Sequence, residues 1–126
     1  MDTSETYIKM CEKADLKPHG TKHDQQWQDG DYYFLDEKVD VYTFWHYPTH
    51  IYNAIWLPRQ DQLQEMVDGD VYEKVCNFYD FVNDVVGWEL MKYKLKEDYF
   101  TSMEQLWLAF VMKEKINKTW NGEDWI

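Results

Sequence analysis

The sequence has very little positive charge, and Arg59 is its only arginine. Lysine and arginine total 13 against 24 aspartates and glutamates, which gives a formal net charge of -11. Nucleic-acid-binding proteins neutralise phosphates with basic patches, so this balance argues against direct contact with DNA, RNA or an anionic membrane. The same charge attracts a basic protein surface, although it also serves simply to keep a domain soluble.

Cysteines and long apolar runs are also scarce. Cys11 and Cys76 form no paired motif, and each falls within an apolar helical pattern, which predicts reduced, buried thiols. The first residues lack the apolar core of a signal peptide, and no apolar run approaches the length that spans a membrane. We therefore expect a cytoplasmic protein that has no membrane partner.

The common catalytic and cofactor motifs are absent. The five glycines are isolated, so the chain contains neither a Walker A loop nor a GxGxxG turn, and no GxSxG segment occurs. Neither cysteine has a neighbouring histidine to act as its base. We therefore expect no enzymatic activity, no cofactor and no catalytic residues.

Aromatic residues, in contrast, are abundant. Seven Trp, ten Tyr and six Phe make up 18% of the chain, which argues against disorder and is sufficient to fill a core. The length fits a single domain over residues 1–126.

The first half of the chain predicts one helix and three strands. Residues 4–16 have apolar side chains at helical spacing behind Ser4 or Thr3 as a cap, and residues 17–31 form a loop. Aromatic and β-branched residues predict strands over 31–37, 39–46 and 51–56, the first two forming a hairpin.

The second half predicts three helices. Pro58 suits the start of a helix that runs to Val67, and further helices span 71–86 and 102–118. Thr101 with Glu104, or Ser102 with Gln105, forms a capping box at the start of the last helix, which is apolar nearly all round and therefore central. Alternating apolar residues and lysines over 88–100 suggest a short edge strand.

These elements predict an α+β fold, in which a small antiparallel sheet of three to four strands packs against three to four helices. We expect the last two helices to form most of the core together with Trp56 and Leu57. On the 71–86 helix, the inward face should be the valine-rich side opposite the acidic side. Its members are Val71, Val75, Phe78, Val82 and Val85.

All four histidines lie within a short part of the chain. His19, His23, His46 and His50, with Asp24, contain the ligand types of a histidine-carboxylate metal site. Their spacing matches no known ligand pattern, so we expect no metal. A metal enzyme built on this cluster is the weakest of the functional alternatives.

Two groups of residues are candidates for contact with a partner. An acidic stripe follows the 71–86 helix and the turn before it, and either mimics phosphate spacing or is an ordinary solvated face. Aromatic rings on and near the predicted strands either anchor a partner, line a ligand pocket or pack in the core. The candidate partner-binding residues are Asp68, Asp70, Glu73, Asp80, Asp84, Tyr42, Phe44 and Trp45.

Arg59 has no obvious electrostatic reason for its position. A cation in the first turn of a helix opposes the helix dipole, but the cost is only roughly a few tenths of a kcal/mol. We therefore expect a structural role, in which the guanidinium fixes the strand-to-helix turn through a carboxylate or backbone carbonyls.

Two segments resemble a family of small conserved proteins encoded by phages and prophages of Gram-positive bacteria. They are IWLPRQDQLQEMV at 55–67 and MEQLWLAFVMKEKINKTWNGEDW at 103–125, and the helix segment YIKMCEKA is also similar. The family supplies no catalytic residues to carry over. The resemblance implies a phage accessory protein that works inside a bacterial cell.

The leading hypothesis is therefore a non-catalytic, phage-encoded protein that binds a protein partner. Small acidic proteins in that setting often block a host protein, so an inhibitor of a host defence nuclease, or of another nucleic-acid enzyme, is the specific expectation. The alternative is a binding or sequestering protein that holds a nucleotide-type ligand in an aromatic pocket.

Overall fold

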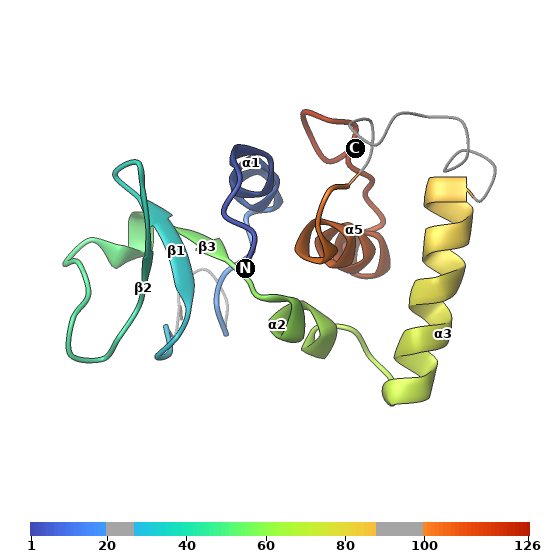
Figure 1. Ribbon diagram of the computed structural model, residues 1–126, viewed down its shortest axis with the longest axis horizontal. Helices are drawn as coiled ribbons and strands as arrows, with labels where there is room; N and C mark the ends of the chain where they lie inside the picture. The colour runs from blue at the N-terminus through green and yellow to red at the C-terminus, as the bar shows by residue number, and fades with distance from the viewer. Residues whose placement is uncertain (20–26, 88–99) are drawn as a thin grey trace. The chain divides into compact units, whose positions relative to one another are not determined.

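The computed structural model describes residues 1–19, 27–87 and 100–126, without the side chains of residues 85–87. The chain divides into two compact units, the first comprising residues 1–59 and 120–126 and the second residues 60–119. The predicted α+β class is confirmed, with a three-stranded antiparallel sheet and four α-helices in the described parts (Figure 1). Within these parts, no helix combines the length and apolar character needed to cross a membrane.

The sheet belongs to unit 1 and has the strand order β2-β1-β3. Strands β1 (Tyr32–Leu35) and β2 (Lys38–Val41) form the predicted hairpin, and β3 (Ile55–Leu57) pairs with the other edge of β1.

The second strand was expected to run to residue 46, but it ends at Val41. A tight turn follows, closed by a bridge between Thr43 and His46, and this reversal prevents the strand from continuing. The start of the third predicted strand is instead a 3-10 turn, Ile51–Asn53.

The hairpin loop places two residues in the left-handed backbone region. Asp36 has φ 51° and Glu37 has φ 62°, between the paired residues Leu35 and Lys38. Two positive φ values in a two-residue loop are typical of a type I′ turn, which favours glycine at the second position.

Replacing Glu37 with glycine is expected to stabilise unit 1 by about 0.5–1 kcal/mol, because it removes the steric penalty of a left-handed residue that carries a Cβ. Urea denaturation followed by circular dichroism measures the change. The matched control is Glu12→Gly in the middle of α1 (Glu5–Ala14), where glycine should destabilise by about as much. A loss of stability in Glu37→Gly would contradict the assignment of the turn.

Helix α1 and the C-terminal tail complete unit 1. Ser4 caps α1 as predicted, since its side chain accepts a hydrogen bond from the Tyr7 backbone N–H. The buried Tyr7 hydroxyl donates to the Pro58 carbonyl at 2.5 Å, and α1 contacts β3. From the tail, the buried Trp125 donates its Nε1–H to the Met10 carbonyl at 3.0 Å. Three segments far apart in sequence are thus joined by buried hydrogen bonds.

Arg59 has the backbone-carbonyl partner that the sequence suggested. Its Nη1 donates to the Gly30 carbonyl at 2.6 Å, and this bond is partly buried. The guanidinium therefore ties the segment after β3 to the turn that precedes β1. Charged donors strengthen such bonds, which makes a structural role sufficient for this residue.

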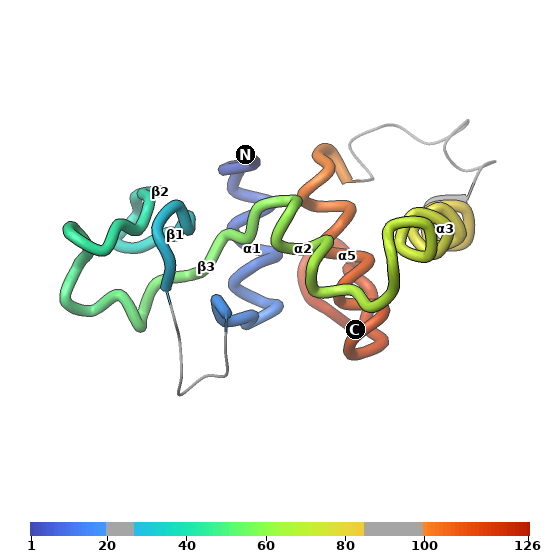
Figure 2. Tube along the Cα trace, turned by 90° about the horizontal axis from the view of Figure 1, so that it is seen from below, coloured from blue at the N-terminus to red at the C-terminus, as the bar shows by residue number. Residues whose placement is uncertain are grey.

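Unit 2 is helical in its described part. Helix α2 (Gln60–Glu65) lies against α5 (Met103–Ile116), as Figure 2 also shows. The Ser102 side chain caps α5 by accepting from the Gln105 backbone N–H, which is one half of the predicted capping box, and the Gln105 side chain accepts from the Thr101 backbone N–H. The prediction that this helix is central is confirmed, because it buries residues on every side. These are Gln105, Trp107, Leu108, Ala109, Phe110, Val111 and Met112.

Helix α3 (Val71–Phe81), followed by a π-helical turn (Val82–Gly87), departs from the prediction. Only Phe81 is buried on α3, while the half-buried Phe78 stacks flat on Trp107 of α5, with 4.0 Å between ring centroids. Val71 and Val75 were predicted to face the core, but they are 73% and 59% exposed. The expectation that α3 supplies a large share of the core is wrong, since α3 is held through one edge that carries two phenyl rings.

Two further expectations concern this region. Cys76 was predicted to be a buried thiol, but it lies on the outer side of α3 and is exposed, whereas Cys11 is buried. Burial raises the pKa of the Cys11 thiol far above its ordinary value.

The edge strand predicted over 88–100 lies almost entirely outside the described residues.

Candidate functional site

The histidines do not form a cluster in the described structure. His19 Nε2 lies 3.1 Å from Oδ2 of the buried Asp31, and His50 Nε2 lies 3.3 Å from Asp36 Oδ2. His46 closes the turn after β2, while His23 lies outside the described residues. Across the described ranges, no three His, Cys, Asp or Glu side chains gather closely enough to hold a metal ion.

The acidic residues at the start of α3 have a structural task. Asp70 is the N-cap, and its Oδ1 accepts from the Glu73 backbone N–H at 2.9 Å. The Glu73 side chain accepts in return from the Asp70 backbone N–H at 3.3 Å. This capping box was missed at the sequence level, although the D-x-x-E spacing that signals it is present. Two of the five acidic candidates therefore serve the helix itself.

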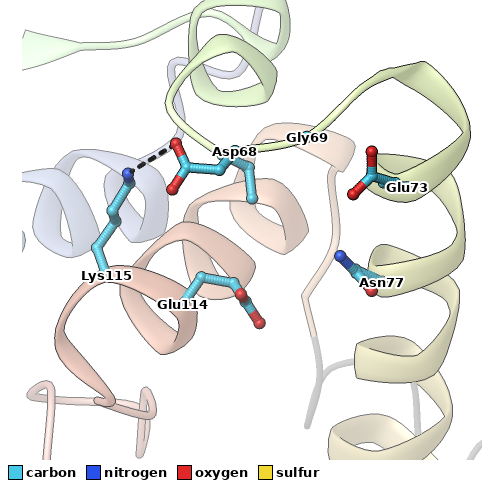
Figure 3. Close-up of a pocket in the computed structure, with 7 residues that line it drawn as sticks. Asp68, Gly69, Glu73, Asn77, Glu114 and Lys115 are labelled. Carbon is cyan, nitrogen blue, oxygen red and sulfur yellow. Dashed lines mark ion pairs between the residues drawn. The ribbon is translucent and has the colours of Figure 1, made fainter.

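A small acidic pocket, shown in Figure 3, lies between the turn before α3, the first turns of α3 and the end of α5. It has a volume of about 230 Å³. Three carboxylates line it, from Asp68, Glu73 and Glu114, and one cation, Lys115, pairs loosely with Asp68 at 3.9 Å. The pocket keeps an excess of negative charge and suits the basic side chain of a partner.

The outer side of α3 is the most unusual surface in the described structure. Tyr72 and Tyr79 are 82% and 66% exposed, beside the exposed Val71 and Val75. Tyr72, Val75 and Tyr79 recur at intervals of three and four residues, so they form one apolar seam along the helix. Sequence reasoning missed this seam because it assigned the valines to the core.

Carboxylates border the seam on the far side from the core. Glu73, Asp80 and Asp84 are exposed and follow one another at intervals of seven and four residues. On a helical projection Glu73 and Asp80 lie away from Phe78 and beyond the seam, while Asp84 belongs to the π-helical turn that follows α3. Helix α3 and the π-helical turn that follows it therefore present an apolar seam with carboxylates beside it.

The aromatic candidates belong to unit 1 and do not share one environment. Phe44 and Trp45 occupy the tip of the 43–46 turn, 65% and 90% exposed, with their rings edge to face at 5.3 Å. The Phe44 backbone N–H donates to Asp29 Oδ1 at 2.6 Å, which fixes the turn. Tyr42 is half-buried and its ring packs between Trp27 and Tyr47. Burial, with the nearby Tyr47, Asp29 and Asp31, raises the pKa of Tyr42.

Three pockets lined by described residues are acidic. They have volumes of about 230, 210 and 310 Å³, and each is lined by at least two carboxylates. Such walls repel the phosphates of a nucleotide. These three pockets therefore suit a basic group better than a nucleotide-type ligand.

Comparisons with models of protein families, with curated proteins and with solved structures found no match to this chain.

Proposed function

We propose that this protein is a non-catalytic binding module that docks a basic amphipathic helix of another protein on α3. One observation carries the proposal: four apolar side chains of α3 stay 59–82% exposed along a seam bordered by carboxylates. A solvated helix of a monomer has no need for such a seam, because exposed apolar patches usually mark sites of association.

The seam has the chemistry of an interface centre. Tyrosine is enriched among the residues that dominate binding energy, because its large ring buries much area and loses little conformational freedom. Apolar residues at intervals of three and four match the pattern by which one helix packs along another. The occupant is therefore a helix with a complementary apolar face.

The charge of the site selects a basic occupant. Glu73, Asp80 and Asp84 flank the seam, and the pocket beside α3 adds Asp68 and Glu114. Complementary charge of this kind raises the association rate at low salt and disfavours acidic partners.

The resemblance to phage and prophage proteins gives the proposal its setting. Enzymes that act on nucleic acid carry lysine- and arginine-rich surfaces for the phosphate backbone. An acidic, helix-docking protein made by a phage is suited to cover such a surface. The specific proposal is an inhibitor of a host defence nuclease or of another nucleic-acid enzyme.

The test compares variants of the seam with a matched tyrosine elsewhere. Tyr72→Ala/Tyr79→Ala is expected to weaken binding to a captured partner by about a hundredfold, since each lost anchor costs tenfold or more. Alanine is the best helix former, so α3 itself should remain intact. Tyr52→Ala, at a position that is 65% exposed in unit 1, is the control and should change little.

Partners are captured from lysate of a Gram-positive bacterium at low salt, identified by mass spectrometry, and measured as purified proteins by calorimetry. Asp80→Asn/Asp84→Asn should lower the association rate at low salt and lose that effect at high salt. A partner that binds the seam variant as tightly as the wild-type protein would exclude α3 as the site. Failure to capture any protein would remove the proposal altogether.

A further inference from the structure

A groove lined by residues of unit 1 has a different chemistry from the seam on α3. It has a volume of about 310 Å³ and runs between one face of the β1–β2 hairpin and residues 46–48. The register pairs Tyr33 with Asp40 and Leu35 with Lys38, so these four side chains share the hairpin face that forms one wall. His46, Tyr47 and Pro48 form the other wall.

Rings and carboxylates meet in this groove. Tyr33 and Tyr47 line it, and Tyr47 is 49% exposed, so part of its ring is open to an incoming group. Asp36 and Asp40 supply two negative charges and Lys38 one positive charge. With neutral histidines the groove therefore keeps a net charge of about one negative unit, which suits a single cation.

The hydrogen bonds leave Asp40 available for a ligand. Its Oδ1 accepts from the Val41 backbone N–H at 2.8 Å, while no lysine, arginine or histidine of the described residues lies within ion-pair distance of it. The charge of Asp40 also acts on the tyrosine beside it. Burial is the larger cause that raises the pKa of Tyr33, and the negative charge of Asp40 is the smaller one. The potential in the groove is negative at the face of an aromatic ring, which favours a bound cation.

We propose that this groove is a recognition site for the guanidinium of an arginine side chain presented by a protein partner. A guanidinium is planar, stacks on tyrosine rings and donates to carboxylates in a fixed fork, whereas an ammonium is a compact and strongly hydrated charge. The site combines the open ring of Tyr47 with the carboxylates of Asp36 and Asp40. It is independent of the seam on α3.

The proposal is tested on the full chain with a blocked arginine, N-acetyl-arginine methylamide, followed by two-dimensional NMR at a pH where the histidines are neutral. We expect saturable shifts at residues 33–48. The matched probe is the blocked citrulline, which has the same shape without the charge and should give no saturable shift. Blocked lysine and spermidine distinguish arginine from ammonium groups and polyamines.

Two variants separate binding from folding. Asp40→Asn keeps the oxygen that accepts from the Val41 N–H but removes the charge, and it should weaken binding about fivefold. Asp15→Asn, an exposed acid of the same unit, should leave binding unchanged. Tyr72→Ala/Tyr79→Ala should also bind the probe normally, so failure of the α3 proposal and of this one can be told apart. Equal binding of citrulline, stronger binding of lysine or spermidine, or an unaffected Asp40→Asn variant would each overturn the assignment.

Discussion

Replacing Phe110 with alanine is expected to reduce the free energy of unfolding of unit 2 by about 3–5 kcal/mol. Phe110 is completely buried in α5, and its ring contacts Phe78, Phe81 and Trp107 at centroid distances of 5.5, 5.2 and 5.5 Å. Truncation loses the transfer energy of the ring and leaves a cavity where three aromatic side chains meet. It also removes a ring that both Phe78 and Phe81 of α3 pack against.

Urea denaturation gives the total effect, and amide hydrogen exchange shows where the loss occurs. Exchange should accelerate in α5 and, more strongly, in α3. The matched control is Phe44→Ala, where a ring that is 65% exposed is removed from a turn of unit 1; it should change stability by less than about 0.5 kcal/mol. Similar losses from the two variants would mean that Phe110 is not in a packed core.

The second large effect is expected at Trp125, near the end of the described chain. This side chain is only 8% exposed, its Nε1–H donates to the Met10 carbonyl of α1, and its ring lies 5.1 Å from that of Trp120. Trp125→Ala should lower the stability of unit 1 by about 3–5 kcal/mol. The loss combines a large buried ring with a carbonyl left without its partner.

The control for Trp125 is another tryptophan of the same unit. Trp45 is 90% exposed at the tip of its turn, so Trp45→Ala should be nearly neutral for stability. Trp125→Phe separates the two contributions, since it keeps most of the ring and loses the donor, and it should cost about 1–2 kcal/mol. If Trp125→Ala were as mild as Trp45→Ala, the tail would not be part of the packed unit.

Several elements could be predicted from the sequence because local chemistry determines them. The Ser102 cap and the apolar character of α5 indicated a central helix, and the hairpin of β1 and β2 followed from strand-like segments that are close in sequence. The partner of Arg59 was foreseen as a backbone carbonyl, but not which one. Gly30 is 29 residues away in sequence, so no local pattern identifies it.

The candidate site was predicted less well, and α3 shows why. Helical periodicity determines which residues share a side, but it does not determine which side a neighbouring helix covers. The rings of Phe78 and Phe81 pack against α5, and this leaves Val71 and Val75 in solvent. Likewise, the strand-like residues after Val41 gave no local sign of the reversal that brings Thr43 to His46.

The bond between Trp125 and Met10 has a consequence for the order in which the protein is made. The two residues are 115 positions apart, so a ribosome that adds roughly 5–20 residues per second needs about 6–23 s between them. During that time α1 is made without the Trp125 ring whose Nε1–H binds its Met10 carbonyl. The contacts that join α1 to residues 120–126 can therefore form only after the whole of unit 2 has been synthesised.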